Sequence, residues 1–191
     1  MKVEYNKMID NNYNPNILFE KAKTSKQPIA GHFEMTGRCN LNCKMCYVHN
    51  LDNVIALQKE LSTEQWKKIF DDAYSCGLLY ATLSGGECLL RKDFKELYLY
   101  LRDKNIYVSV FTNGTLINDD IVDFFVKYPP FYVQISLYGS NEEHYTQVTG
   151  HKGFSKTINS ILALQTAGID VRDVVTPSKY MGDDFVEIHR L

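Results

Sequence analysis

The sequence predicts an α/β protein in which helices pack outside a parallel sheet. Short apolar runs rich in β-branched and aromatic residues alternate with longer amphipathic stretches that have the period of a helix. Strands joined through helices run parallel, because such a crossover returns the chain to the same end of the sheet. Polar and glycine residues recur directly after the strands, where parallel sheets bind ligands. The 191 residues, 45% of them hydrophobic, fit one domain with a sizeable core.

The predicted strands cover residues 29–35, 80–84, 106–112, 131–137 and 170–176. Their continuous apolar character is typical of parallel strands that are covered on both faces. The first is followed by a long polar connection that reaches to about residue 60. A sheet that ends at the fifth strand leaves an open edge, which is a liability for unwanted strand pairing.

Helices are predicted between these strands, over residues 15–23, 62–77, 92–103, 119–127 and 155–167, with a last one from about residue 183. The first begins at Asn14 and Pro15, because proline is tolerated at the first helical position. Ser62 and Gln65 have capping-box spacing, and Pro129 ends the fourth helix. The side chains expected to face the core from the second and third helices are Trp66, Ile69, Phe70, Ala73, Phe94, Leu97, Tyr98 and Leu101.

Three of the five cysteines, Cys39, Cys43 and Cys46, fall within eight residues. Thiolates are the usual ligands of iron–sulfur clusters, so this spacing predicts a cluster held by one short loop. Three ligands leave one iron of a four-iron cluster open to a substrate or cofactor. The other two, Cys76 and Cys88, stand alone, and Cys76 is expected to be a buried structural thiol. The five histidines have no metal-like spacing.

Two other interpretations of the three cysteines remain. Their spacing also describes one face of a helix, although the glycine and two asparagines among and beside them are poor helix formers. A zinc site usually needs four ligands, and only Cys43 and Cys46 form a Cys-x-x-Cys pair. A non-catalytic iron–sulfur or zinc-binding module is therefore the alternative from a different class of function.

The segment 33–47, Phe-Glu-Met-Thr-Gly-Arg-Cys-Asn-Leu-Asn-Cys-Lys-Met-Cys-Tyr, resembles the signature loop of the radical S-adenosylmethionine (radical SAM) enzymes. The resemblance implies that Cys39, Cys43 and Cys46 hold a 4Fe-4S cluster whose fourth iron is chelated by SAM. It implies reductive cleavage of SAM to a 5′-deoxyadenosyl radical, which abstracts hydrogen from a substrate, and an electron donor of the flavodoxin or ferredoxin type. Tyr47 would lie near the adenine, although a core aromatic is nearly as good an interpretation.

The tetrapeptide Ser84-Gly85-Gly86-Glu87 follows the second strand. Its glycines let a ligand approach the backbone, and its carboxylate can receive an ammonium group, although alone the sequence would describe a mere turn. Placed after the cysteine loop, it resembles the family's Gly-Gly-Glu motif, which holds the amino group of SAM. Cys88 takes the place of the usual proline, and we interpret it as a substitution and not a ligand.

Two later strand ends complete the expected SAM site. Asn113 matches a family residue that lies near SAM, although its Thr-Asn-Gly segment could also be a tight turn. Ser136 matches a family residue whose hydroxyl contacts the ribose or carboxylate of SAM. Tyr138 stands where many relatives have aspartate. Many relatives carry an arginine shortly before the glycine matched by Gly150, and this chain has Thr149 there. Lys152 or Arg172 is then a guess for the cation that holds the SAM carboxylate, although a solvated surface charge is the plainer interpretation of each.

The resemblance divides the chain into an N-terminal extension with a short helix, 1–28, and a radical SAM core, 29–191. That core is expected to be a partial (β/α) barrel whose sixth βα unit is missing, so the chain alone is expected to be weakly active or inactive. Residues 135–139 and 148–150 look closest to the subgroup that modifies peptides or proteins, often with a SPASM domain. An activase of a glycyl-radical enzyme is the alternative within the same chemistry.

Charge and composition limit the partners. A net charge of −2 offers no electrostatic case for nucleic acid, and no apolar run has the length to span a membrane. Clustered thiols without a secretory signal are typical of a reducing cytoplasm. The expected partners are therefore an electron donor and a peptide or protein substrate.

Overall fold

The computed structural model describes residues 17–48, 53–176, 179–181 and 184–188. Within them a single parallel sheet has its strands in the order β1-β2-β3-β4-β5, which is also their order along the chain. The strands are β1 (Ala30–Glu34), β2 (Tyr80–Ser84), β3 (Tyr107–Thr112), β4 (Val133–Ser136) and β5 (Val171–Val174). The α/β fold with a parallel sheet is thus as predicted, and in the described part of the chain β5 is an edge that pairs only with β4.

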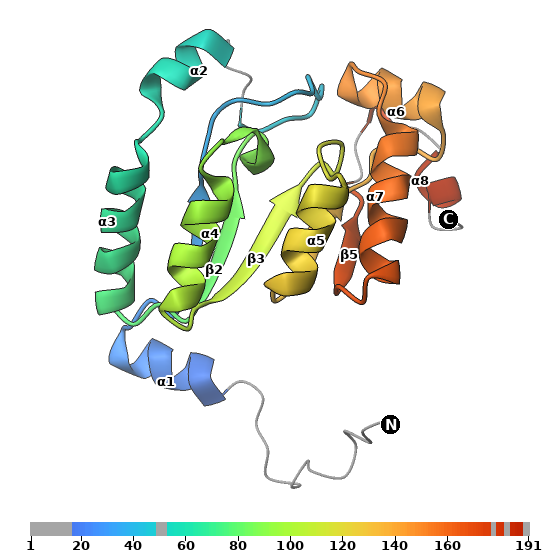
Figure 1. The fold of residues 1–191 in the computed structure, drawn as a ribbon. Coiled ribbons are helices and arrows are strands. Elements are labelled where there is room, and N and C mark those ends of the chain that lie inside the picture. The colour runs from blue at the N-terminus through green and yellow to red at the C-terminus, as the bar shows by residue number, and fades with distance from the viewer. Residues whose placement is uncertain (1–16, 49–52, 177–178, 182–183, 189–191) are drawn as a thin grey trace, which may run out of the picture.

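The helices are α1 (Ile17–Ser25), α2 (Asn53–Lys59), α3 (Thr63–Ser75), α4 (Phe94–Asp103), α5 (Asp119–Lys127), α6 (Glu142–Thr149), α7 (Phe154–Thr166) and α8 (Asp184–Ile188), with a 3-10 turn η2 (Cys88–Leu90). Figure 1 shows α3, α4, α5 and α7 on one face of the sheet and α1 at the end opposite the cysteine loop. The described helices include none long and apolar enough to cross a membrane.

The main core lies between the sheet and these outer helices. Trp66 and Phe70 of α3 and all four predicted positions of α4 are buried there, against apolar strand residues such as Leu83 and Val110. Each such side chain contributes about 1.5–3 kcal/mol when fully buried. The predicted capping box is present, because Ser62 accepts from Gln65 N and the Gln65 side chain accepts from Ser62 N.

The other face of the sheet differs from the prediction that both faces would be covered. Side chains alternate along a strand, so Phe33 packs against the outer helices while His32 and Glu34 point to the opposite face, where they are exposed. Tyr107 of β3 is likewise 55% exposed. This open inner face is what remains when helices cover a curved sheet from outside only.

Several local predictions need correction. Helix α2 falls in the stretch expected to be an irregular connection, and α6 was not predicted at all. Cys76, expected to be buried, is exposed at the C-cap of α3. The first helix is seen from Ile17, and its predicted start at Asn14 and Pro15 lies outside the described residues.

Candidate active site

A cavity of about 300 Å³ opens at the carboxyl ends of the strands. This volume is at the lower end of the range for small-molecule sites. Eight predicted site residues line it: Cys39, Cys43, Cys46, Tyr47, Gly85, Gly86, Asn113 and Ser136. They come from the cysteine loop and from the ends of β2, β3 and β4, because parallel strands bring all their carboxyl ends to one edge.

Backbone hydrogen bonds fasten the cysteine loop, residues 35–48, on two sides. On one side Gly86 N and Glu87 N donate to Thr36 O and Arg38 O, both at 2.8 Å. On the other side the loop is bonded to α6, with Asn42 N donating to Thr149 O at 2.8 Å and Lys44 N to Val148 O at 3.0 Å. The unpredicted helix α6 is therefore one of the two supports of the loop.

A charged cluster holds the start of the same loop. Glu60 receives hydrogen bonds from the Arg38 guanidinium at 2.6 and 3.2 Å and from the Thr36 hydroxyl, and Arg91 lies 3.5 Å away. Burial alone would raise the pKa of Glu60, but the hydrogen bonds from Arg38 and Thr36 and the charges of Arg38 and Arg91 hold it below its usual range. Arg91 also donates to Met35 O, which fixes the end of β1.

The two glycines of the Gly-Gly-Glu segment are needed for contact with the cysteine loop. A Cβ on Gly85 would lie 2.4 Å from Thr36 O, and one on Gly86 would lie 2.3 Å from Arg38 O. Gly85 also has a φ of +134°, which side chains rarely allow. From the sequence we expected the glycines to let a ligand approach the backbone closely. In the structure they let the backbone of the cysteine loop approach, and they also line the cavity.

Of the nine residues predicted to hold the cluster and SAM, Glu87 alone does not line the cavity. It is 1% exposed, and its carboxylate accepts hydrogen bonds from Thr112 Oγ1 at 2.8 and 2.9 Å, Asn113 N at 2.8 Å and Leu89 N at 3.1 Å. Burial raises its pKa, and these hydrogen bonds oppose the rise. The carboxylate thus joins β2 to the end of β3, and its contact with a SAM ammonium stays a prediction.

The three loop cysteines are free thiols beside the cavity. Burial raises the pKa of Cys39, and it raises the pKa of Cys43 to about 12 with a further contribution from the neighbouring sulfurs. No group of three or more His, Cys, Asp or Glu side chains in the described ranges is placed to hold a single metal ion. The irons of a four-iron cluster lie at separate corners of a cube, and each can take its own thiolate ligand. Three thiols that form no disulfide, on one loop that packs against Gly85 and Gly86, therefore fit a cluster.

Other predicted residues lie away from the cavity. Cys88 is fully buried and its Sγ contacts Phe111 O at 3.4 Å; that it is not a ligand stays a prediction. Arg172 pairs with Asp170 and stacks over Tyr132, with its guanidinium carbon 3.8 Å from the ring centre. Neither Arg172 nor Lys152 lines the cavity.

Sequence reasoning missed several lining residues, among them His32 and Gln134 on the inner face of the sheet and Thr176 just beyond β5. His32 Nε2 lies 2.5 Å from Ser84 Oγ, and its ring meets Phe111 edge-on. The alternation of side chains along a strand could have found two of them. Gln134 lies two residues before Ser136 on β4, and His32 is in register with Thr82, two residues before Ser84.

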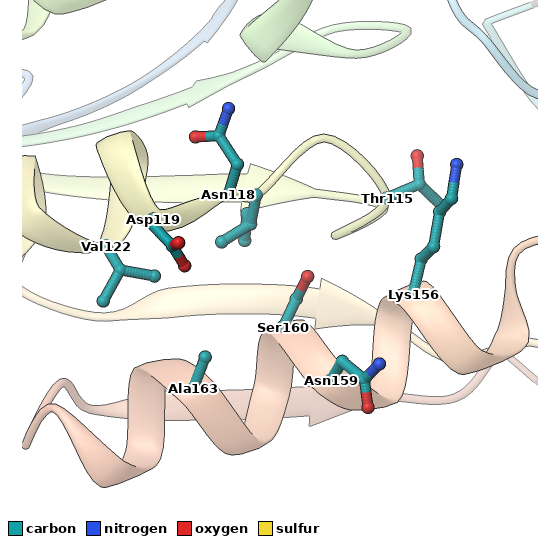
Figure 2. A pocket seen from close by; sticks show the side chains of 9 residues that line it. Thr115, Asn118, Asp119, Val122, Lys156, Asn159, Ser160 and Ala163 are labelled. Carbon is teal, nitrogen blue, oxygen red and sulfur yellow. The ribbon is translucent and has the colours of Figure 1, made fainter.

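A second hollow of about 340 Å³ lies on the outer side, between the start of α5 and α7 (Figure 2). Its lining includes Asn118, whose side chain caps α5 by accepting from Ile121 N, and Ser160, which donates to Gly114 O at 2.7 Å. None of the nine predicted site residues lines it.

Comparison with known proteins identifies the family. The family model of the radical SAM superfamily matches residues 33–191. This chain belongs to the radical SAM superfamily. Members of the superfamily bind a 4Fe-4S cluster and SAM, so the cofactors expected from the sequence are those of the family.

Curated relatives of this radical SAM chain include the Fe-coproporphyrin III synthase of Methanosarcina barkeri, 36% identical over 158 residues, which are 82% of this chain and 38% of the relative. The sporulation killing factor maturation protein SkfB of Bacillus subtilis is 33% identical over 162 residues, with coverages of 84% and 38%. The chain therefore spans about 38% of the length of these relatives.

Solved structures with the same fold include SuiB of Streptococcus suis. The crystal structure bound to S-adenosylmethionine matches with a TM-score of 0.72 at 19% identity, covering 90% of this chain and 40% of that one. The structure bound to precursor peptide SuiA matches with a TM-score of 0.72 at 20% identity, covering 98% and 45%. The predicted partial-barrel fold is confirmed by these matches.

Proposed function

We propose that this chain is the core of a radical SAM enzyme in which Cys39, Cys43 and Cys46 hold a 4Fe-4S cluster and the adjoining cavity takes SAM. The observation that carries the proposal is the meeting of three free thiols with the ends of β2, β3 and β4 around one cavity. When bound, the two cofactors supply a 5′-deoxyadenosyl radical by one-electron cleavage of SAM, with a flavodoxin- or ferredoxin-type protein as electron donor.

The chain's own residues would orient the nucleotide. Ser136 presents a hydroxyl to the cavity and Asn113 lines it at the end of β3, while the exposed ring of Tyr47 at its rim is available to stack on adenine. Gly85 and Gly86 line the cavity with backbone alone, which lets a ligand approach closely. Glu87, beneath them, keeps the ends of β2 and β3 together.

For the substrate we propose a peptide or protein. SkfB by its name matures a killing factor, and SuiB has been crystallised with a precursor peptide. The open inner face, with His32 and Glu34 exposed beside the cavity, offers an extended surface on which a chain could lie. The Fe-coproporphyrin III synthase supports a second candidate, a tetrapyrrole substrate.

The experiment is anaerobic reconstitution with iron and sulfide, followed by reduction with dithionite in the presence of SAM and detection of 5′-deoxyadenosine. The variant with alanine at Cys39, Cys43 and Cys46 should lose iron, colour and product. Cys76→Ala is the matched control, because Cys76 is exposed and away from the cavity, and it should behave as wild type. A triple variant that kept its iron would refute the site.

Substrate class requires a separate comparison. The yield of 5′-deoxyadenosine should rise when a precursor peptide encoded beside the protein is added, and it should not respond to an iron coproporphyrin. The reverse pattern would favour the tetrapyrrole candidate. A response only to a large glycyl-radical enzyme would favour an activase.

A further inference from the structure

A closed ring of side-chain hydrogen bonds lies directly behind Cys39. Asn113 Nδ2 donates to Asn40 Oδ1 at 2.9 Å, Asn40 Nδ2 donates to Thr115 Oγ1 at 2.7 Å, and Thr115 Oγ1 donates to Asn113 Oδ1 at 2.6 Å. Each member thus donates to the next and accepts from the one before. Hydrogen bonds arranged head to tail in this way polarise one another and hold their groups rigid.

A backbone N–H beside the ring determines which way the Asn113 amide points. Thr115 N, a backbone group that can only donate, contacts Asn113 Oδ1 at 2.9 Å, so the oxygen of the amide must face it. The amide NH₂ is then directed the other way. One of its hydrogens serves Asn40, and the second faces Cys39 Sγ, with the nitrogen 3.9 Å from the sulfur.

The surroundings keep this arrangement in place. Asn113 is 7% exposed, so its amide has little water to turn to. Helix α7 holds the turn from behind, because Thr157 Oγ1 donates to Asn113 O at 3.2 Å. Thr115, at the far side of the ring, also lines the hollow between α5 and α7 (Figure 2). Cys39 Sγ accepts a further N–H, from Leu41 at 3.4 Å.

We propose that Asn113 donates an N–H···S hydrogen bond to the Cys39 thiolate of a bound cluster, and that Asn40 is a positioning residue that fixes the amide for this bond. Hydrogen bonds to the sulfurs stabilise the more negative, reduced form of an iron–sulfur cluster and so raise its reduction potential. This inference rests on the proposed function, because it needs a cluster on Cys39. It assigns to Asn113 a role that does not require SAM.

The test measures the midpoint potential of the reconstituted cluster in the absence of SAM, by redox titration followed in the visible spectrum and by electron paramagnetic resonance. Asn113→Ala removes the donor and should shift the potential to more negative values. Asn40→Ala and Thr115→Val, which open the ring, should shift it in the same direction by a smaller amount. Thr24→Val, which removes a hydroxyl bonded within α1, should leave it unchanged.

Iron content and circular dichroism are measured for every variant. An unchanged potential in Asn113→Ala or in Asn40→Ala at full iron content would overturn the inference. So would folded variants that hold no cluster, since the ring is assigned to the potential and not to cluster retention. If the wild-type chain itself takes up no cluster, the proposed function fails; if it does and the variants titrate as wild type, this inference alone fails.

Discussion

The contact between Gly86 and the cysteine loop gives the sharpest prediction. In Gly86→Ala the new methyl carbon would lie 2.3 Å from Arg38 O and 2.7 Å from Arg38 C. Carbon and oxygen atoms normally approach no closer than about 3.3 Å, so the two backbones must part by about 1 Å. The bonds Gly86 N to Thr36 O and Glu87 N to Arg38 O, both 2.8 Å long, would then exceed hydrogen-bonding distance.

The expected loss in the free energy of unfolding follows from these broken hydrogen bonds and the steric overlap. Each hydrogen bond contributes about 0.5–1.5 kcal/mol, and overpacking costs about 1–3 kcal/mol, part of which is relieved when the backbones separate. We expect a net loss of about 2–3 kcal/mol, which corresponds to a fall in Tm of roughly 5–10 °C for a chain of this size. If the loop detaches locally instead, the same free energy weakens cluster retention by roughly 30–150-fold.

The assay pairs thermal unfolding of the iron-free protein with iron and sulfide content after anaerobic reconstitution. Gly168→Ala is the matched control. Gly168 has a φ of +79° and a methyl group added there would have no neighbour within 4 Å, so alanine costs about 1–2 kcal/mol of backbone strain without touching the loop. The control should lose stability but keep its cluster. Gly86→Ala with wild-type Tm and iron content, or equal cluster loss in both variants, would refute the reasoning.

Three further outcomes are expected. Glu87→Gln should lower the free energy of unfolding in urea by about 1–3 kcal/mol, because an amide NH₂ would face a buried donor, whereas the exposed Glu143→Gln should have little effect. Because the folded state holds the pKa of Glu60 below its ordinary value, ionised Glu60 stabilises the fold. This stabilisation is fully present above the ordinary glutamate pKa of about 4.3 and is lost as pH falls through the folded-state pKa. In Glu60→Gln, the free energy of unfolding measured against pH should lose that part of its acid dependence. Leu97→Ala should cost about 2–5 kcal/mol, and Leu57→Ala, at a residue 54% exposed, should stay within about 0.5 kcal/mol of wild type.

Local signals in the sequence predicted most of the fold. The capping box at Ser62, the apolar spacing of α3 and α4 and the β-branched strands each depend on neighbours within a few residues, so they can be recognised without tertiary contacts. The cysteine loop could be recognised equally well, since its three cysteines lie in one short segment. Helices α2 and α6 were missed because their apolar patterns are short, and α6 is stabilised by its contacts with the cysteine loop and α7.

The sequence by itself indicated the family, the succession of strands along the chain and the three clustered thiols, because these are encoded in local spacing. Only the tertiary structure decided what each neighbouring residue does. It buried Glu87 under the cavity, set the glycines against the backbone of the cysteine loop and brought Asn40 to Asn113 across 73 positions of the chain. Such contacts join segments far apart in sequence, and their geometry is fixed by packing, which no local pattern records.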